Sequence, residues 1–162
     1  MRQRIMRRGG AVKRWHTIDN IKAQTVADHS WGVACIIADL WPNASADLLR
    51  AALYHDITEH VTGDIPAPAK WKFPELANTL RGIEFQLGAE LGIETTLNEL
   101  DSLLLKIADM LELLWYCVEE ERLGNKNFKE VFTRGSHYLQ ELDLGKEAKE
   151  MLDYLIEIEA EL

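Results

Sequence analysis

The spacing of apolar residues is the feature that most constrains the fold of this chain. Apolar residues recur at steps of three and four over most of the sequence, and no two-residue alternation lasts long enough for a strand. Such spacing puts apolar side chains on one face of a helix, and that face must be buried against other helices. At 162 residues the chain is long enough for one core and short for two. We therefore predict a single all-α domain, a bundle of about six helices over residues 1–162.

Capping and turn signals place these helices along the chain. An irregular segment is expected to about Gln24, and the helices are expected over residues 25–41, 45–56, 75–91, 98–123, 127–142 and 146–160. Ser45 is the predicted N-cap of the second helix, and Gly92 and Gly124 mark the ends of the third and fourth. Glycine and proline make residues 63–74 a turn-rich connector, which we expect to lie beside the functional site.

The charge of the chain is negative overall and unevenly distributed. The net charge of -9 argues against a protein that binds a nucleic acid polymer, because phosphate backbones require a broad positive field. Basic residues nevertheless dominate the segment before the first acidic residue, Asp19: Arg2, Arg4, Arg7, Arg8, Lys13 and Arg14. Two interpretations stay open: a basic arm near substrate phosphates or a neighbouring subunit's acidic tail, or a partly disordered terminus over residues 1–8.

Hydropathy and cysteine content indicate a cytoplasmic protein with no membrane partner. No apolar run approaches the ~20 residues that a membrane span needs, and no secretory signal is visible. Cys35 and Cys117 occupy apolar helical positions without a CxxC spacing, so we expect both to be reduced core residues. Four tryptophans are expected in the core or at a subunit interface, which favours a homo-oligomer: Trp31, Trp41, Trp71 and Trp115.

Ionisable residues interrupt three of the apolar helical faces. They are His29, the adjacent pair His55 and Asp56, and Asp109. A single histidine on an apolar face is usually a hydrogen-bonded core residue, and this remains the alternative for His29 taken alone. Two imidazoles and two carboxylates together form a ligand set that suits a divalent transition metal ion and leaves positions for water or substrate. Such a site is suited to hydrolysis.

The order of these residues resembles that of the HD-domain phosphohydrolases, in which a His, His-Asp and Asp pattern supplies the metal ligands. The resemblance assigns the ligand role to His29, His55, Asp56 and Asp109. It implies a transition metal cofactor, Co, Mn, Zn, Ni or Fe, with additional Mg as an open alternative.

Over roughly residues 10–125 the chain resembles the small 5'-deoxynucleotidases typified by YfbR and the phage dATP triphosphohydrolases of the DatZ type. The helices over 127–160 complete the domain. The matching motifs are Arg14-Trp15, Asp28-His29-Ser30, residues 55–66, and Lys106 to Asp109. Asp28 departs conservatively, because the nucleotidase motif has glutamate there.

The resemblance also implies roles for charged residues around the ligands. Glu59 and Asp64 are the candidates for general acid and base, and the alternative is that Glu59 acts as a helix cap or pairs with Lys70. Arg14, Lys70 and Lys106 are the expected phosphate-binding residues, although a solvated surface role stays open for each lysine.

Two residues are expected to contact the sugar or the base. Trp15 would leave no room for a ribose 2'-hydroxyl, which predicts a preference for deoxyribose, whereas an ordinary buried tryptophan is the alternative. Gln24 would hydrogen-bond adenine through both of its amide groups. His16, His60 and His137 lack partners at a suitable spacing and receive no chemical role.

The resemblance implies a metal-dependent enzyme that cleaves the 5'-phosphoester of deoxyribonucleotides. Three cations exceed what one monophosphate requires and mildly favour dATP, hydrolysed to deoxyadenosine and triphosphate. The alternative is a 5'-deoxynucleotidase acting on deoxynucleoside monophosphates. A non-catalytic nucleotide-binding module is the third interpretation, and the intact ligand set counts against it.

Overall fold

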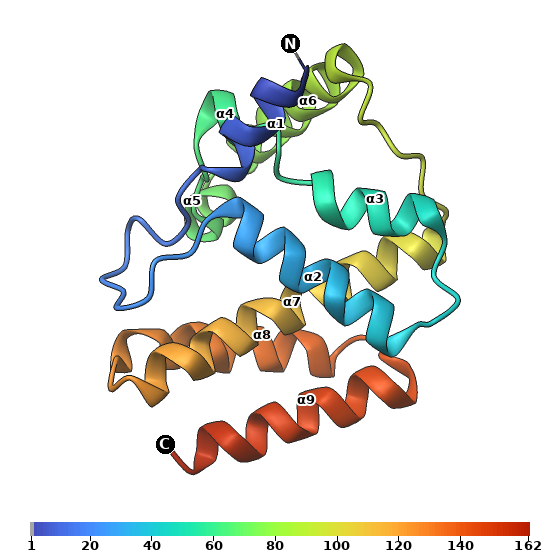
Figure 1. The fold of residues 1–162 in the computed structure, drawn as a ribbon. Coiled ribbons are helices and arrows are strands. Elements are labelled where there is room, and N and C mark those ends of the chain that lie inside the picture. Colours follow the sequence, from blue (N-terminus) through green and yellow to red (C-terminus); the bar gives the residue numbers. More distant parts are fainter. Residues whose placement is uncertain (1) are drawn as a thin grey trace.

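Helices account for all regular elements of the structure, a computed structural model that describes residues 2–162 (Figure 1). The elements are α1 (Arg2–Gly10), α2 (Val26–Leu40), α3 (Ala46–Tyr54), α4 (Glu59–Thr62), α5 (Ala67–Lys72), α6 (Pro74–Leu91), α7 (Glu99–Arg122), the 3-10 helix η1 (Lys126–Phe128), α8 (Lys129–Gln140) and α9 (Gly145–Ala160). Among the described residues β-type pairing is limited to an isolated bridge between Lys13 and Thr25. The predicted all-α fold is confirmed, but the expected number of helices was too low.

Helix α7 is the centre of the bundle and contacts α2, α3, α8 and α9 (Figure 1). Its 24 residues span roughly 36 Å at 1.5 Å per residue. Ile107, Leu111, Leu114 and Val118 recur along it at helical spacing and are fully buried. Helix α2 packs against this buried face of α7. The packing brings His29, a polar residue of α2, next to residues of α7.

Side-chain caps determine where two of these helices begin. The Thr25 hydroxyl accepts a hydrogen bond from the backbone of Asp28, whose carboxylate accepts one from the backbone of Thr25. This capping box fixes the first turn of α2 immediately before His29. Ser45 accepts a hydrogen bond from the backbone N–H of Leu48, as predicted for the N-cap of α3.

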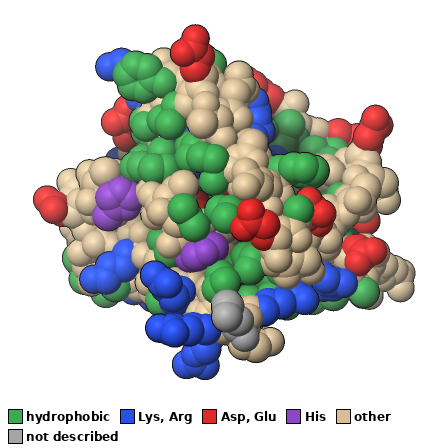
Figure 2. All heavy atoms as spheres, turned by 90° about the horizontal axis from the view of Figure 1, so that it is seen from above, with side chains coloured by type: hydrophobic (Ala, Val, Ile, Leu, Met, Phe, Trp, Pro, Cys, Tyr) green, Lys and Arg blue, Asp and Glu red, His purple; other side chains and the backbone are tan. Residues whose placement is uncertain are grey.

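The N-terminal segment forms a helix, contrary to the irregular structure expected there. Helix α1 packs on α2 and α4, so the alternative of a disordered terminus is wrong for residues 2–8, whereas residue 1 lies outside the described residues. Gly9 makes this packing possible, because a Cβ at that position would lie 2.4 Å from the carbonyl oxygen of Ile57. Figure 2 looks down on the end of the molecule where α1, α4 and α6 lie and shows Lys and Arg side chains gathered along one edge of that face.

The connector after α3 contains two short helices, α4 and α5, that the sequence pattern did not predict. Helix α3 ends at Tyr54 with His55 as its C-cap, two residues before the expected end at Asp56. The backbone turns there: the N–H of Ile57 bonds to the carbonyl of Tyr54, and the N–H of Glu59 bonds to that of Asp56. His55 and Glu59 therefore approach the site from a turn and a new helix rather than from one helical face.

Three residues expected in the core, or for the tryptophans in the core or at a subunit interface, lie on the surface. Cys117 is buried, but Cys35 is exposed on α2. Trp31 and Trp71 are 68% and 65% exposed. Helical spacing cannot distinguish the two sides of a helix that is apolar over much of its circumference, and the core side of α2 is taken by other residues. None of the helices over residues 2–162 is long and apolar enough to cross a membrane.

Candidate active site

Three of the four predicted metal ligands converge at the junction of α2, α3 and α7. His29 lies on α2, His55 immediately follows α3, and Asp109 lies on α7. Each offers one ligand atom, and these atoms lie within 4.8 Å of one another. The Nε2 atom of His55 is buried and has no hydrogen-bond partner. A buried bare imidazole nitrogen facing a carboxylate fits a divalent transition metal ion.

Both imidazole rings are held through their other nitrogen. Nδ1 of His55 lies 2.9 Å from the carbonyl oxygen of Ala52, one turn earlier in α3. Nδ1 of His29 bonds to the carboxylate of Glu112 on α7. A carbonyl or carboxylate oxygen can only accept, so in a neutral ring the proton lies on Nδ1 and Nε2 carries the lone pair that a metal ion needs.

Asp56, the fourth predicted ligand, lies at the edge of this cluster. Its Oδ2 atom is 3.3 Å from Nε2 of His55 and 3.8 Å from Nε2 of His29. The same oxygen accepts a hydrogen bond of 3.0 Å from the guanidinium of Arg14. The Nε atom of Arg14 is buried without a hydrogen-bond partner. Arg14 therefore borders the ligand cluster through its contact with Asp56 and has one donor that the described residues do not use.

The charges of His29 and Asp109 support each other. Burial alone would lower the pKa of His29, but its hydrogen bonds to the carboxylates of Asp109 and Glu112 outweigh burial and raise that pKa to about 9. Burial would raise the pKa of Asp109, but the hydrogen bond from His29, 3.1 Å away, holds it below its ordinary value. Because a metal ion competes with the proton for Nε2 of His29, metal binding is expected to release protons.

Glu59 is a buried carboxyl group beside the cluster. One of its oxygens has no hydrogen-bond partner. Burial, and then the negative charges of Asp56 and Asp64, raise the pKa of Glu59 to about 9, although Arg14 and Lys70 oppose this shift. No ion pair joins Glu59 to Lys70 in the described part of the chain. Glu59 is thus a buried carboxyl group with a raised pKa and one oxygen without a hydrogen-bond partner.

The two predicted phosphate-binding lysines flank the cluster. Lys106 is exposed on α7; its Nζ atom is 3.9 Å from the carboxylate of Asp109 and 5.7 Å from the centre of the Tyr138 ring. Lys70 is half-buried on α5, and its charge acts on Glu59. Neither lysine is part of the core, so both side chains are free to extend toward a ligand.

Trp15 and Gln24 face each other inside the protein. The indole of Trp15 stacks on Tyr116, with 5.4 Å between ring centres, and meets Phe128 edge-on. Its Nε1 atom donates to Oε1 of Gln24 at 2.7 Å, and Nε2 of Gln24 donates to Glu112 at 2.8 Å. Both amide groups of Gln24 are thus engaged within the protein. Reading of adenine by Gln24 would require both bonds to open.

The backbone of Trp15 is strained. Its φ of 60° lies in the left-handed region, which a bulky residue rarely adopts. The adjoining residues hold it there, since the N–H of Arg14 bonds to the carbonyl of Gln24. Such strain persists only where the surrounding structure enforces it and is concentrated at functional sites.

Glu120, which received no role from the sequence, fixes the loop that carries Arg14 and Trp15. Its carboxylate is fully buried and accepts hydrogen bonds from the backbone N–H groups of Ile21 and Lys22 at 2.8 and 2.6 Å. It also accepts one from Asn125. Burial opposes ionisation, but these donors lower the pKa of Glu120 below its ordinary value of 4.5.

Replacing Glu120 by glutamine is expected to destabilise the protein by about 2 kcal/mol at pH 7, because an amide cannot accept from donors on both sides. The pKa of Glu120 is lower in the folded protein than in the unfolded protein. Its carboxylate therefore stabilises the fold fully above the unfolded-state pKa, and this stabilisation is lost as pH falls through the folded-state pKa. The difference between wild type and Glu120→Gln in urea unfolding should therefore shrink below pH 4.5. Glu119→Gln, at an exposed neighbouring position, should change stability little at either pH. Equal losses in the two variants would contradict this role.

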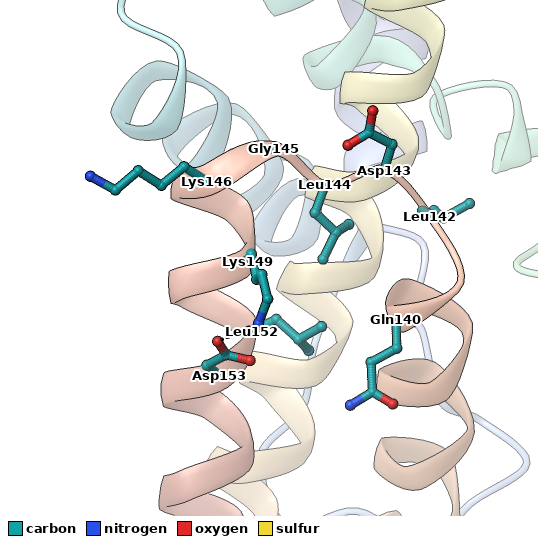
Figure 3. Close-up of a pocket in the computed structure, with 9 residues that line it drawn as sticks. All are labelled: Gln140, Leu142, Asp143, Leu144, Gly145, Lys146, Lys149, Leu152 and Asp153. Atoms are coloured by element: carbon teal, nitrogen blue, oxygen red, sulfur yellow. Dashed lines mark hydrogen bonds and ion pairs between the residues drawn. The ribbon is translucent and has the colours of Figure 1, made fainter.

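Two cavities differ in their relation to the site. A cavity of about 230 Å³ is bordered by His55, Thr58 and Glu84, so it reaches the ligand cluster. A larger one of about 460 Å³ lies at the turn between α8 and α9, where Lys149 and Asp153 line it (Figure 3). None of the predicted site residues borders the larger cavity, and we assign it no part in the chemistry.

Comparison with known proteins places this geometry in a family. The family model for 5'-deoxynucleotidase YfbR-like proteins matches residues 3–158. The chain belongs to this family. Membership confirms the predicted YfbR-like HD phosphohydrolase, and with it the prediction of an enzyme rather than a silent binding module. As a YfbR-like protein, the chain is expected to use its His and Asp cluster for metal binding.

Among curated relatives, a dATP triphosphohydrolase of Salmonella phage PMBT28 is 30% identical over 87% of this chain and 79% of its own length. A 5'-deoxynucleotidase of Enterobacter sp. strain 638 is 28% identical over 91% of this chain and 83% of its own. Both names are those of enzymes that act on deoxynucleotides, as expected for this family.

Solved structures share the fold. The cyanophage S-2L HD phosphohydrolase DatZ, solved with dA and one catalytic Zn²⁺ ion, superposes with a TM-score of 0.74 at 24% identity, covering 97% of this chain and 96% of DatZ. The PH0347 protein of Pyrococcus horikoshii gives 0.75 at 23%, covering 97% and 98%. At these identities the likeness concerns the arrangement of the helices.

Proposed function

We propose that this chain is a metal-dependent phosphohydrolase of deoxyribonucleotides that converts dATP to deoxyadenosine and triphosphate. The observation that carries the proposal is the convergence of His29, His55 and Asp109 close to the buried carboxyl group of Glu59. The phage relative named dATP triphosphohydrolase favours dATP. The relatives named 5'-deoxynucleotidase favour the second candidate, hydrolysis of deoxynucleoside monophosphates to phosphate and deoxynucleoside.

The residues present would hold one divalent ion through His29, His55, Asp109 and Asp56. When bound, such an ion lowers the pKa of coordinated water and neutralises charge that grows on the phosphoryl group. Co, Mn, Zn, Ni and Fe all suit this donor set, and an additional Mg ion remains part of the proposal.

The chain's own residues would position the substrate and move its protons. Arg14 presents a buried donor beside Asp56, and Lys70 and Lys106 supply positive charge for a longer phosphate chain. Burial raises the pKa of Glu59, which suits donation of a proton to the departing 5'-oxygen. Asp64 would then accept a proton from the attacking water.

The remaining predictions concern specificity and assembly. Trp15 is proposed to limit the sugar to deoxyribose from its strained position in the loop before α2. A homo-oligomer in the cytoplasm completes the proposal; the exposed Trp31 and Trp71 suit a subunit interface.

The proposal is tested by incubating the purified protein with Mn²⁺ or Co²⁺ and dATP, dAMP, the other deoxynucleotides or ATP, and separating the products by anion exchange. We expect triphosphate and deoxyadenosine from dATP, with little turnover of ATP. Phosphate released only from monophosphates would replace the first candidate by the second. A chelated sample is the control, and activity that survives chelation would contradict a metal-dependent reaction.

A further inference from the structure

A chain of hydrogen bonds joins Trp15 to the predicted metal ligand His29. Trp15 donates to Gln24, Gln24 donates to Glu112, and Glu112 bonds to Nδ1 of His29. Gln24, Glu112 and His29 are only 6%, 8% and 0% exposed. Buried polar groups in such a chain must all be satisfied, because water cannot replace a missing partner.

The donors and acceptors allow this chain only one direction. An indole N–H can only donate, so Gln24 must turn its carbonyl oxygen toward Trp15. The NH₂ group of Gln24 then faces Glu112 and requires an acceptor there. A carboxylate satisfies that donor with one oxygen and accepts from Nδ1 of His29 with the other. When His29 gives up its second proton, the remaining proton is thereby fixed on Nδ1, and the lone pair of Nε2 faces Asp109, 3.1 Å away.

Helix α2 leaves room for this arrangement. Gly32 lies three residues after His29 and so on the same side of α2. A Cβ at Gly32 would come within 2.8 Å of Cγ of Glu112. A glycine at this position allows the Glu112 side chain to cross the face of α2 and reach His29.

We propose that Glu112 is a positioning residue for the metal centre, oriented by Trp15 and Gln24 so that His29 presents Nε2 to a divalent ion. This inference rests on the metal site of the proposed function. It also gives Gln24 a role that differs from base recognition, and it connects the residue predicted to contact the sugar with a metal ligand.

The test is a titration of metal-stripped protein with Co²⁺, followed by the visible absorption of the bound ion. Glu112→Gln cannot satisfy both neighbours: its NH₂ group faces either the NH₂ of Gln24 or Nδ1 of His29, and the latter drives the proton to Nε2. We expect Co²⁺ affinity to fall about 10- to 100-fold, with an altered spectrum.

The double variant Gln24→Glu, Glu112→Gln swaps the two residue types. It restores a donor opposite every acceptor at nearly unchanged side-chain volume. We expect the double variant to recover most of the affinity that Glu112→Gln loses, whereas a merely structural role would let the two changes add. Glu99→Gln, exposed on the same helix, is the matched control and should bind as wild type. Circular dichroism and thermal melting verify that each variant is folded.

Wild-type affinity in Glu112→Gln, or a double variant no tighter than Glu112→Gln, would overturn the inference. Wild-type protein that takes up no Co²⁺ would overturn the metal site itself. Wild-type protein that binds Co²⁺ but hydrolyses no deoxynucleotide would overturn the proposed function alone, and the order of affinities among the variants would still decide the role of Glu112.

Discussion

Replacing His55 by alanine is expected to reduce kcat/KM for the preferred deoxynucleotide at least about 1000-fold, because a metal ion contributes several kcal/mol of transition-state stabilisation. His55 supplies a buried Nε2 atom that has no hydrogen-bond partner among the described residues. Its Nδ1 atom bonds only within its own turn, to Ala52. Removal of the ring therefore takes away a ligand and leaves the contacts between helices largely intact. Steady-state kinetics and Co²⁺ titration of the same preparation measure both consequences.

His137→Ala is the matched control for this variant. His137 is exposed on α8, and no hydrogen bond or ion pair of its side chain occurs among residues 2–162. The control should retain wild-type turnover and Co²⁺ affinity. If His55→Ala binds Co²⁺ and hydrolyses the substrate as the control does, the cluster of His29, His55 and Asp109 is not the catalytic metal site.

Much of the fold was predictable because its signals are local. The start of α2 follows from the Thr25 and Asp28 capping box, and the start of α3 from Ser45. The ends of these helices fall within a few residues of the predicted positions. Short helices behave differently: α4 and α5 have four and six residues, too few to be stable without tertiary contacts, so sequence pattern alone does not reveal them.

Helix α1 shows the same limit at the N-terminus. Its helical state depends on packing against α2 and α4, and that packing depends on the missing side chain of Gly9. In the sequence, a pair of glycines at the end of a basic segment indicates a flexible turn. Only the position of the Ile57 carbonyl explains why glycine is required there.

The ligand residues were predictable from their order, whereas the residues that orient them were not. Glu112 follows Asp109 by three residues and so lies on the same face of α7, a signal that the sequence did contain. Nothing in the sequence, however, shows that it bonds to His29, 83 residues earlier. The buried contact of Gln24 with Glu112 likewise depends on how the loop before α2 folds back onto α7.

Replacing Glu59 by glutamine is expected to lower kcat by about 100- to 10,000-fold while leaving Co²⁺ affinity close to wild type. Glu59 lies beside the ligand cluster, and its ligand atoms are not part of the converging group. Glutamine keeps the shape and neutral charge of the protonated acid but cannot release a proton. A loss confined to kcat would thus separate proton transfer from metal binding.

The same variant is expected to gain stability, and such a gain would exclude misfolding as the cause of lost activity. Burial raises the pKa of Glu59 from 4.5 to about 9, so its protonated form contributes stability that is fully present below pH 4.5 and is lost as pH rises toward 9. Glutamine does not ionise, and Glu59→Gln should melt at or above the wild-type temperature at pH 8, with the difference growing as pH rises.

Glu75→Gln, exposed at the start of α6, is the control and should show neither the loss of kcat nor the change in melting temperature. Wild-type kcat in Glu59→Gln would transfer the acid role to Asp64, and a lower melting temperature would show that the Glu59 carboxylate is ionised and paired in the folded protein.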